Sequence, residues 1–395
     1  MSENKLLKDR RLYVIFCITL VGVMGVASLT PALPKISQAL DLNKSEIALL
    51  ISAFTFPGIF LTPVAGGFAD RLGRKTVLIP SLFIFGLAGF SIFFVKNFHL
   101  IIILRVIQGI GAAPLGSINI TLVGDFFRGK DRPSAMGYNA SVLSLSTASY
   151  PLIGGALAGI AWYYPFILPL LAFPVGLFVI FGIREPKFEK VSDFRQYIKA
   201  ISISIRKKEV IGIFMLGILT FLILYGAFLT YIPFLVSQKF DLTPPQIGIL
   251  LSISSLTTAI LASQVGRLTN RFGSLSLLKT AFTLYIVVSL LIPNVSHLCL
   301  FLLPVLIFGA AQALNVPSLQ TSLANLAPDN QRGAFMSLNG MVLRIGQTLG
   351  PLIMGVGYSV GEMNGVYYLS ALVALAGLVV LFTMISSKKI EVSES

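Results

Sequence analysis

Residues 29–52 read LTPALPKISQALDLNKSEIALLIS, and residues 229–252 read LTYIPFLVSQKFDLTPPQIGILLS. Nine of these 24 positions are identical, at a constant offset of 200 residues and without a gap. Residues 132–155 and 332–355 match at another nine of 24 positions with the same offset. Apolar composition alone would not keep one offset and also align polar residues such as Asp41 and Asp241. The chain is therefore predicted to contain two copies of one unit.

The composition places both copies in a lipid bilayer. Of the 395 residues, 55% are hydrophobic and 12% are charged, and the mean hydropathy is +0.86. A soluble domain carries about twice that charged fraction, whereas apolar runs of about 20 residues can cross a hydrocarbon core of roughly 30 Å. Twelve membrane spans are predicted, six in each copy, at residues 13–36, 46–69, 76–95, 100–125, 134–158, 163–183, 210–237, 246–268, 275–293, 298–324, 333–357 and 364–386.

The basic residues lie mostly on one side of these spans. Twenty-three lysines and arginines fall in the terminal segments and loops of one side, and four fall on the other: Lys35, Lys44, Lys96 and Lys239. The positive-inside rule then places both termini in the cytoplasm of a multi-pass protein of the cell membrane. The net charge of +14 reflects this topology, and no nucleic-acid partner is expected. No cleavage pattern closes the first apolar run, which is expected to remain a span.

An even number of spans gives both copies the same orientation, so they are parallel repeats. This architecture places a substrate site at the interface of the halves and transports by rocking one half on the other. The predicted fold is an all-α membrane protein of twelve transmembrane helices in two six-helix repeats, 1–183 and 210–395. Segment 184–209 is predicted to be a cytoplasmic linker whose amphipathic helix lies on the anionic inner leaflet. A gating role for that helix is the alternative.

Two motifs stand out in the first half, one in a loop after the second span and one inside the fourth span. Residues 66–75 read GGFADRLGRK, in which the glycines are expected to form a tight turn and Asp70 to cap a helix or pair with a neighbouring cation. Residues 101–113 read IIILRVIQGIGAA and place Arg105 inside a span. An arginine there costs about 2.5–3.5 kcal/mol on insertion scales, so it is expected to face a partner or a cavity.

These motifs make the chain resemble the major facilitator superfamily over nearly its whole length. Stretch 66–75 is similar to the family's cytoplasmic loop signature, and 101–113 to its fourth-helix signature, whose arginine the family links to proton coupling. Gly25 and the run Pro31-Ala32-Leu33-Pro34 resemble a first-helix pattern of twelve-span drug:proton antiporters. The resemblance implies a gate that latches the halves, formed by Gly66, Asp70, Arg71, Gly73, Arg74, Asp125 and Arg132. Helix capping by Asp70, and a local ion pair of Asp125 with Arg128 or Arg132, are the structural alternatives.

The fifth span departs from the antiporter pattern. That signature expects a glycine before the proline, but this chain has Tyr150-Pro151 followed by Gly154 and Gly155. The second copy, with Gly350-Pro351, is closer to the pattern. Proline and glycine bend helices and thin their packing surface. A bulky Tyr150 is therefore expected to alter the contact that this helix makes.

Arg105 and Arg344 are the only basic residues placed deep in spans, and no Asp or Glu lies equally deep. Either the substrate carries negative charge, or carbonyls and amides such as Gln108 and Gln347 satisfy the guanidinium groups. Neutral polar residues expected to line the cavity or contact substrate are Gln108, Asn119, Asn139, Tyr231, Gln312, Asn315 and Asn339. The alternative for each is a structural hydrogen bond between helices, of ~1 kcal/mol.

These features favour a secondary transporter that works by alternating access, most simply a proton-coupled antiporter exporting small hydrophobic or amphipathic compounds. A carrier of organic anions or of an anionic lipid is the alternative. An enzyme is not expected, because the chain lacks catalytic motifs such as H-E-x-x-H or G-x-S-x-G, and it has no P-loop for ATP. No cofactor or metal is expected, and the proton is the expected coupling ion. The expected partners are a small-molecule substrate and the lipid bilayer, and the protein is expected to be a monomer.

Overall fold

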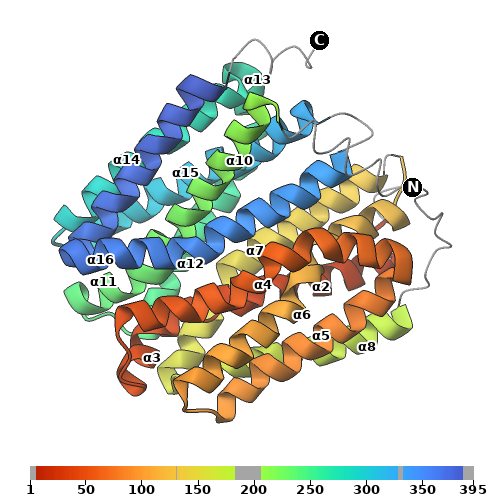
Figure 1. Ribbon diagram of the computed structural model, residues 1–395, viewed down its shortest axis with the longest axis horizontal. Coiled ribbons are helices and arrows are strands. Elements are labelled where there is room, and N and C mark those ends of the chain that lie inside the picture. Colours follow the sequence, from red (N-terminus) through yellow and green to blue (C-terminus); the bar gives the residue numbers. More distant parts are fainter. Residues whose placement is uncertain (1–5, 130, 183–205, 328–331, 386–395) are drawn as a thin grey trace. The chain divides into compact units, whose positions relative to one another are not determined.

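The structure is a computed structural model that describes residues 6–129, 131–182, 206–327 and 332–385 (Figure 1). Every regular element in these ranges is a helix. The predicted linker, 184–209, lies almost entirely outside the described residues. The chain divides into two compact units, the first holding the helices up to Gly182 together with Thr243–Ile249, and the second holding the remainder.

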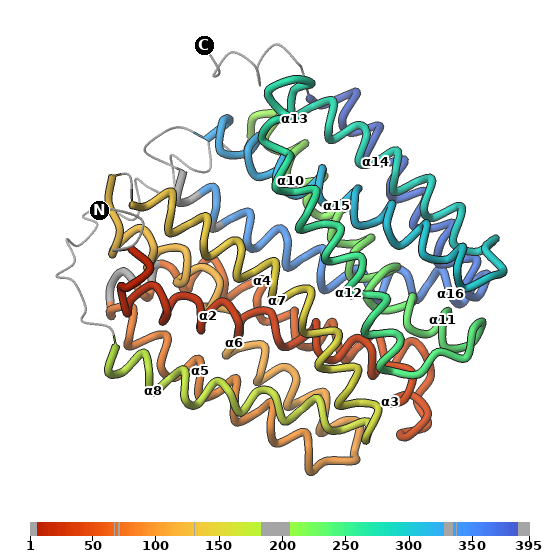
Figure 2. The backbone as a smooth tube through the Cα atoms, turned by 180° about the vertical axis from the view of Figure 1, so that it is seen from behind, coloured from red at the N-terminus to blue at the C-terminus, as the bar shows by residue number. Residues whose placement is uncertain are grey.

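The first unit contains six long helical passages, each beginning or ending near a predicted span boundary. Its elements are α2 (Arg10–Ala27), η1 (Thr30–Ala32), α3 (Leu33–Ala39), α4 (Lys44–Leu72), α5 (Arg74–Ser91), η2 (Ile92–Phe94), α6 (Phe98–Phe126), α7 (Asp131–Ile160), η3 (Tyr164–Leu171) and α8 (Ala172–Gly182). Helix α5 packs between α6 and α8, and α2 packs against α6 and α7 (Figure 2). Helix α6 thus packs against α2, α4, α5 and α7, and it carries the candidate residues Arg105, Gln108 and Asn119.

The second copy repeats this order. Its elements are α10 (Lys208–Phe221), η4 (Leu222–Tyr231), α11 (Ile232–Phe240), α12 (Pro244–Ala262), α13 (Val265–Phe272), α14 (Ser274–Leu291), η5 (Ile292–Asn294), α15 (Leu298–Leu326) and α16 (Arg332–Met384). Helices α5 and α14, and likewise α6 and α15, have the same bounds shifted by 200 residues. The repeat seen in the sequence is thus also a repeat of helix boundaries.

Backbone details of the turns repeat as well. Asp41 and Asp241 both adopt a left-handed conformation with φ of 51°. The next helix starts with Asn43 and Glu46 forming a capping box in the first copy, and with the Thr243 amide donating to Gln246 Oε1 at 2.8 Å in the second. Such caps satisfy amides that have no partner inside the helix. The duplicated sequence therefore preserves the chemistry that starts the second passage of each copy.

Eleven helices among the described residues are long and apolar enough to cross a membrane. One of them, Leu338–Met384, has 47 residues, more than twice the roughly 20 that a bilayer needs. It is broken at Gly361 and at Glu362, where φ is 51° and ψ is −138°. The two arms of α16 account for the eleventh and twelfth predicted spans.

Large apolar side chains cover the outside of these helices. Phe181 is 84% exposed, Val360 is 85% exposed and Phe94 is 70% exposed. Water would make this surface strongly unfavourable, whereas lipid chains are as apolar as the side chains themselves. The exposed surface of the spans is therefore suited to a bilayer.

The two copies differ at one place that bears on the site. Thr30 donates its hydroxyl to the carbonyl of Val26, four residues back, at 3.0 Å. Its repeat partner Thr230 donates to Tyr225, five residues back, at 2.6 Å. Residues Leu222–Tyr231 form a π-helix, η4, just before Pro233, which has no amide to continue a regular ladder. The seventh span is therefore wider here than its counterpart in the first copy.

Candidate functional site

Arg105 lies at the centre of the first unit and is 1% exposed. Its Nε donates to the carbonyl of Leu50 at 2.9 Å, and its Nη1 donates to the carbonyl of Gly25 at 3.0 Å and to Gln108 Oε1 at 2.8 Å. The guanidinium also lies 4.4 Å from the centroid of the Phe54 ring. Dipoles and an aromatic face therefore stabilise this cation in place of a carboxylate.

Glycines allow the helices to converge on this arginine. A Cβ at Gly25 would lie 2.5 Å from the Phe54 ring, and a Cβ at Gly109 would overlap the Phe54 carbonyl oxygen. Close backbone approach places carbonyls of α2 and α4 within reach of α6. One donor, Arg105 Nη2, is buried and has no partner among the described residues.

Arg344 repeats part of this arrangement in the second unit. Its Nη1 donates to Gln347 Oε1 at 3.0 Å, with the same spacing of three residues as Arg105 and Gln108. The side chain is half-buried, and the described residues give it no acidic partner. The bonds from Arg105 to Gln108 and from Arg344 to Gln347 agree with one of the two arrangements that the sequence left open, the one in which amides bind the arginines.

Asn119 and Asn139 form one network with Thr19, a residue that the sequence analysis did not select. Asn119 Nδ2 donates to Thr19 Oγ1 at 2.9 Å and to the carbonyl of Ile15 at 2.8 Å. Asn139 Nδ2 donates to Asn119 Oδ1 at 3.1 Å, and Thr19 Oγ1 lies 2.5 Å from Asn139 Oδ1. This ring of bonds joins α2, α6 and α7 and leaves little hydrogen-bonding capacity for a substrate.

The second unit has no equivalent ring among its described residues. Asn339 is half-buried and has no hydrogen bond in that part of the chain, because the positions matching Thr19 and Asn119 are Leu219 and Leu319. Asn315 Oδ1 instead accepts from Thr220 Oγ1 at 3.1 Å, while its Nδ2 is unpartnered there.

Unpartnered buried polar atoms gather in the second unit. Of all such atoms in the described ranges, only Arg105 Nη2 lies in the first unit; the others are Tyr231 Oη, Ser252 Oγ, Tyr285 Oη, Gln312 Nε2, Asn315 Nδ2, Ser318 Oγ, Ser322 Oγ and Tyr367 Oη. Four of them belong to α15, at spacings of three, three and four residues, which places them on one face of that helix. Each unmade hydrogen bond costs about 1–3 kcal/mol.

The predicted gate is described in part. Arg74 is buried, and its Nε donates to Asp125 Oδ2 at 3.1 Å; Asp125 thus pairs with Arg74 and not, as the alternative held, with Arg128 or Arg132. The exposed Arg132 side chain instead lies beside Gly124. Asp70 and Arg71 fall in the last turn of α4, and their side chains lie outside the described part.

The glycines of the same motif have different roles. Gly73 ends α4 with φ of 98°, which only glycine adopts without strain. Gly66, however, lies within α4 and faces open space. The prediction that it forms a tight turn is therefore wrong, because the helix continues for another turn and a half before the chain reverses.

The fifth and eleventh spans both contain glycines that approach the backbone of a neighbouring span, at positions that differ between the two copies. In the first unit, Tyr150 is buried, and Gly154 touches the backbone of Ser28, where a Cβ would overlap the carbonyl oxygen. In the second, Gly350 holds the position of Tyr150 and meets Gly226, with a Cβ 2.9 Å from its amide nitrogen. Pro151, Gly155 and Pro351 are buried beside these contacts. Tyr150 thus shifts the close contact to the next turn, as its bulk predicts.

Known proteins are similar to this chain over nearly its whole length. The family model described as Major Facilitator Superfamily matches residues 15–243 and 233–395. The chain belongs to the major facilitator superfamily. Multidrug resistance protein 1 of Bacillus subtilis is 25% identical over 94% of this chain and 95% of its own length. Quinolone resistance protein NorA of Staphylococcus aureus is 24% identical over 94% of this chain and 96% of its own.

Solved structures of the superfamily share the fold. The nucleoside transporter NupG superposes with a TM-score of 0.76 at 14% identity, covering 95% of this chain and 98% of that one. The predicted fold class, two repeats of the major facilitator fold, is confirmed. Like other members of the superfamily, this chain is a multi-pass membrane transporter of small molecules and not an enzyme.

Proposed function

We propose that this superfamily member exports small hydrophobic or amphipathic compounds in exchange for protons. The observation that carries the proposal is the set of neutral, buried residues of α15 that each have a polar atom without a hydrogen-bond partner in the described part of the chain: Gln312, Asn315, Ser318 and Ser322. Such groups can bind the polar part of an uncharged or cationic amphiphile without a fixed counter-charge. Full-length likeness to multidrug and quinolone resistance proteins supports export of compounds of this kind.

The buried arginine of the first unit supports the same choice. Arg105 already makes hydrogen bonds to two carbonyls and an amide, and Phe54 covers its face. Its charge is therefore largely satisfied within the protein, and it is better suited to holding α2, α4 and α6 together during transport than to binding an anionic substrate.

The orientation in the membrane is proposed from the distribution of basic residues, which places both termini in the cytoplasm. We propose that the working unit is a monomer.

Proton coupling requires a carboxylate that titrates during the cycle. Asp125 is the candidate with a described partner in the gate, since it forms an ion pair with the buried Arg74. The ion pair of Asp9 with the exposed Arg11, by contrast, lies outside the loop motif. We therefore assign Asp125 to coupling, together with the loop motif that contains Asp70.

Proteoliposomes test this function. Purified protein is reconstituted with a pH dye inside, a pH gradient is imposed, and lipophilic cations and organic anions are added in turn. We expect the cations to drive proton movement, and Asp125→Asn to remove that movement while cations still bind. Asp131→Asn, which removes an equal charge near the same end of the unit, should keep it. Cation transport without any proton flux would contradict the coupling.

Arg344 supports a second candidate, transport of organic anions. It is a half-buried cation in a span, and its described partner is the neutral Gln347. If anions are substrates, Arg344→Gln should weaken their transport by about tenfold or more, because a close charge pair contributes about 2 kcal/mol or more. Transport of cations by the same variant should not fall. An equal loss for both classes of substrate would exclude this candidate.

A further inference from the structure

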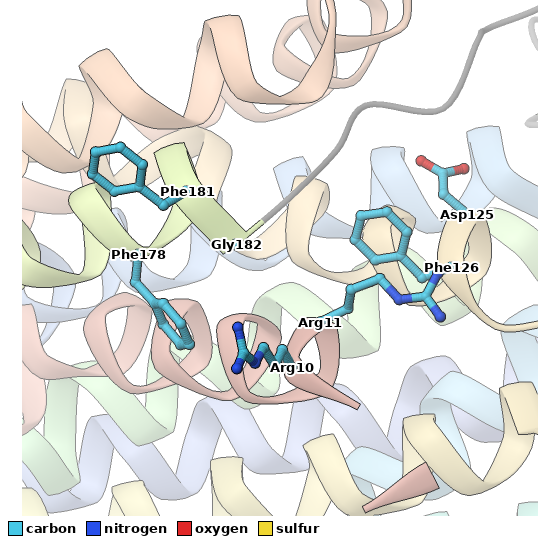
Figure 3. A pocket seen from close by; sticks show the side chains of 7 residues that line it. All are labelled: Arg10, Arg11, Asp125, Phe126, Phe178, Phe181 and Gly182. Carbon is cyan, nitrogen blue, oxygen red and sulfur yellow. The ribbon is translucent and has the colours of Figure 1, made fainter. Parts of the chain in front are cut away.

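One end of the first unit has a pocket that none of the transport roles above explains. It has a volume of about 500 Å³ and lies where α2 begins and where α6 and α8 end (Figure 3). Its lining consists of Arg10, Arg11, Asp125, Phe126, Phe178, Phe181 and Gly182. A volume of this order is typical of small-molecule sites. The pocket is open beside two aromatic rings of α8, so its ligand is expected to have an apolar part.

The charges around the pocket leave one arginine unpaired. Asp125 is bound to Arg74 at 3.1 Å, and Asp9 is bound to Arg11 at 2.6 Å. The hydrogen bond from Arg11 also lowers the pKa of Asp9, which keeps that carboxylate charged at neutral pH. Arg10 is exposed and has no acidic or hydrogen-bonding partner in the described part of the chain. The pocket therefore presents a net positive charge from Arg10.

The apolar side of the pocket faces the lipid. Phe181 is 84% exposed and Phe178 is 37% exposed, and both belong to the last turns of a membrane span. In Figure 3 the side chain of Arg10 extends toward Phe178, and Arg11 lies beside Phe126. The Arg11 guanidinium is 5.5 Å from the centroid of that ring, within cation–π range. Cations next to exposed aromatic rings at the end of a span match the boundary between headgroups and acyl chains.

We propose that this pocket binds the phosphate of an anionic phospholipid, with Arg10 as the main contact and the acyl chains lying beside Phe178 and Phe181. Arginine can bind a phosphate through two parallel hydrogen bonds. The inner leaflet is rich in anionic lipids, and the abundance of basic residues places this end of the unit on that side. The lipid would then lie next to the Asp125–Arg74 pair without replacing either partner.

Calorimetric titration of the full-length protein in an uncharged detergent tests the proposal. The probes are dioctanoyl phosphatidylglycerol, dioctanoyl phosphatidylcholine and glycerol phosphate. We expect phosphatidylglycerol to bind clearly more tightly than the other two. Arg10→Gln should weaken its binding by about fivefold, the effect of one basic residue near a membrane surface, and Arg10→Lys should retain much of it.

Arg128→Gln is the matched control, because it removes an equal charge near the end of α6 from outside the pocket. An equal loss of affinity in Arg128→Gln would show diffuse attraction and overturn the site. Equal binding of phosphatidylcholine would exclude the phosphate contact. If glycerol phosphate binds as tightly as phosphatidylglycerol, the ligand is a free phosphate ester and the lipid assignment is wrong. Phe181→Ala should weaken the binding of phosphatidylglycerol and leave the binding of glycerol phosphate unchanged. The titration needs no transport substrate, so its outcome is independent of the proposed export.

Discussion

Arg105→Ala is expected to abolish transport while the protein remains folded in the membrane. The substitution removes the bonds to the Leu50 and Gly25 carbonyls and to Gln108. Losing even one hydrogen bond of a charged group, about 3 kcal/mol, corresponds to about two orders of magnitude in a rate. We therefore expect turnover to fall by about 100-fold or more. Initial rates of substrate efflux from proteoliposomes measure this effect.

Graded variants separate the contributions of this cluster. Arg105→Lys keeps the charge but cannot reach both carbonyls with a planar fork, so it should lose nearly as much activity as alanine. Gln108→Ala leaves the two carbonyl bonds in place and should cost far less. Size-exclusion profiles and thermal unfolding check that each variant is folded. Normal transport by Arg105→Ala would show that the arginine only stabilises helix packing.

Gly154→Ala is expected to destabilise the first unit strongly. A Cβ at this position would overlap the carbonyl oxygen of Ser28, and a backbone atom cannot move aside as the end of a flexible side chain can. Overpacking of this kind costs about 1–3 kcal/mol and occasionally more. The contact also joins α2 to α7, so both the midpoint of thermal unfolding and the transport rate should fall.

The same helix provides a matched control. Gly137 belongs to α7, and a Cβ there would meet no atom within 4 Å. Gly137→Ala should therefore be neutral or stabilising by about 1 kcal/mol, the difference in helix propensity between the two residues. If both variants had the same unfolding midpoint, the close approach of α2 and α7 at Ser28 would not be the feature that holds them together.

The sequence predicted the spans and their repetition well, because long apolar runs and a constant offset depend only on order along the chain. One of the two arrangements that the sequence left open has Gln108 and Gln347 bound to the two arginines, and the spacing of three residues that places such side chains on one helical face agrees with it. The carbonyls of Gly25 and Leu50 were not predictable in this way. Their contacts depend on how closely helices distant in sequence approach one another.

A match between the two copies does not by itself predict that two asparagines make the same contacts. Asn139 and Asn339 match by position, yet within the described residues only Asn139 belongs to a network, because its partners Thr19 and Asn119 are leucines in the second copy. A polar residue paired by duplication keeps its role only when its neighbours are duplicated too. The difference is visible in the sequence at the counterparts of the polar residues in spans one and four.

The π-helix of the seventh span has a geometric consequence for the wall it forms. A regular α-helix turns by about 100° per residue. If η4 relaxed to α-helical bonding, the extra residue would have to be absorbed, and every side chain beyond it would rotate around the axis by about that angle. Tyr231 would then point at a different neighbour although no helix had moved. The second copy thus has a segment whose rewinding would change the surface it offers, and the described part of the first copy holds no π-helix.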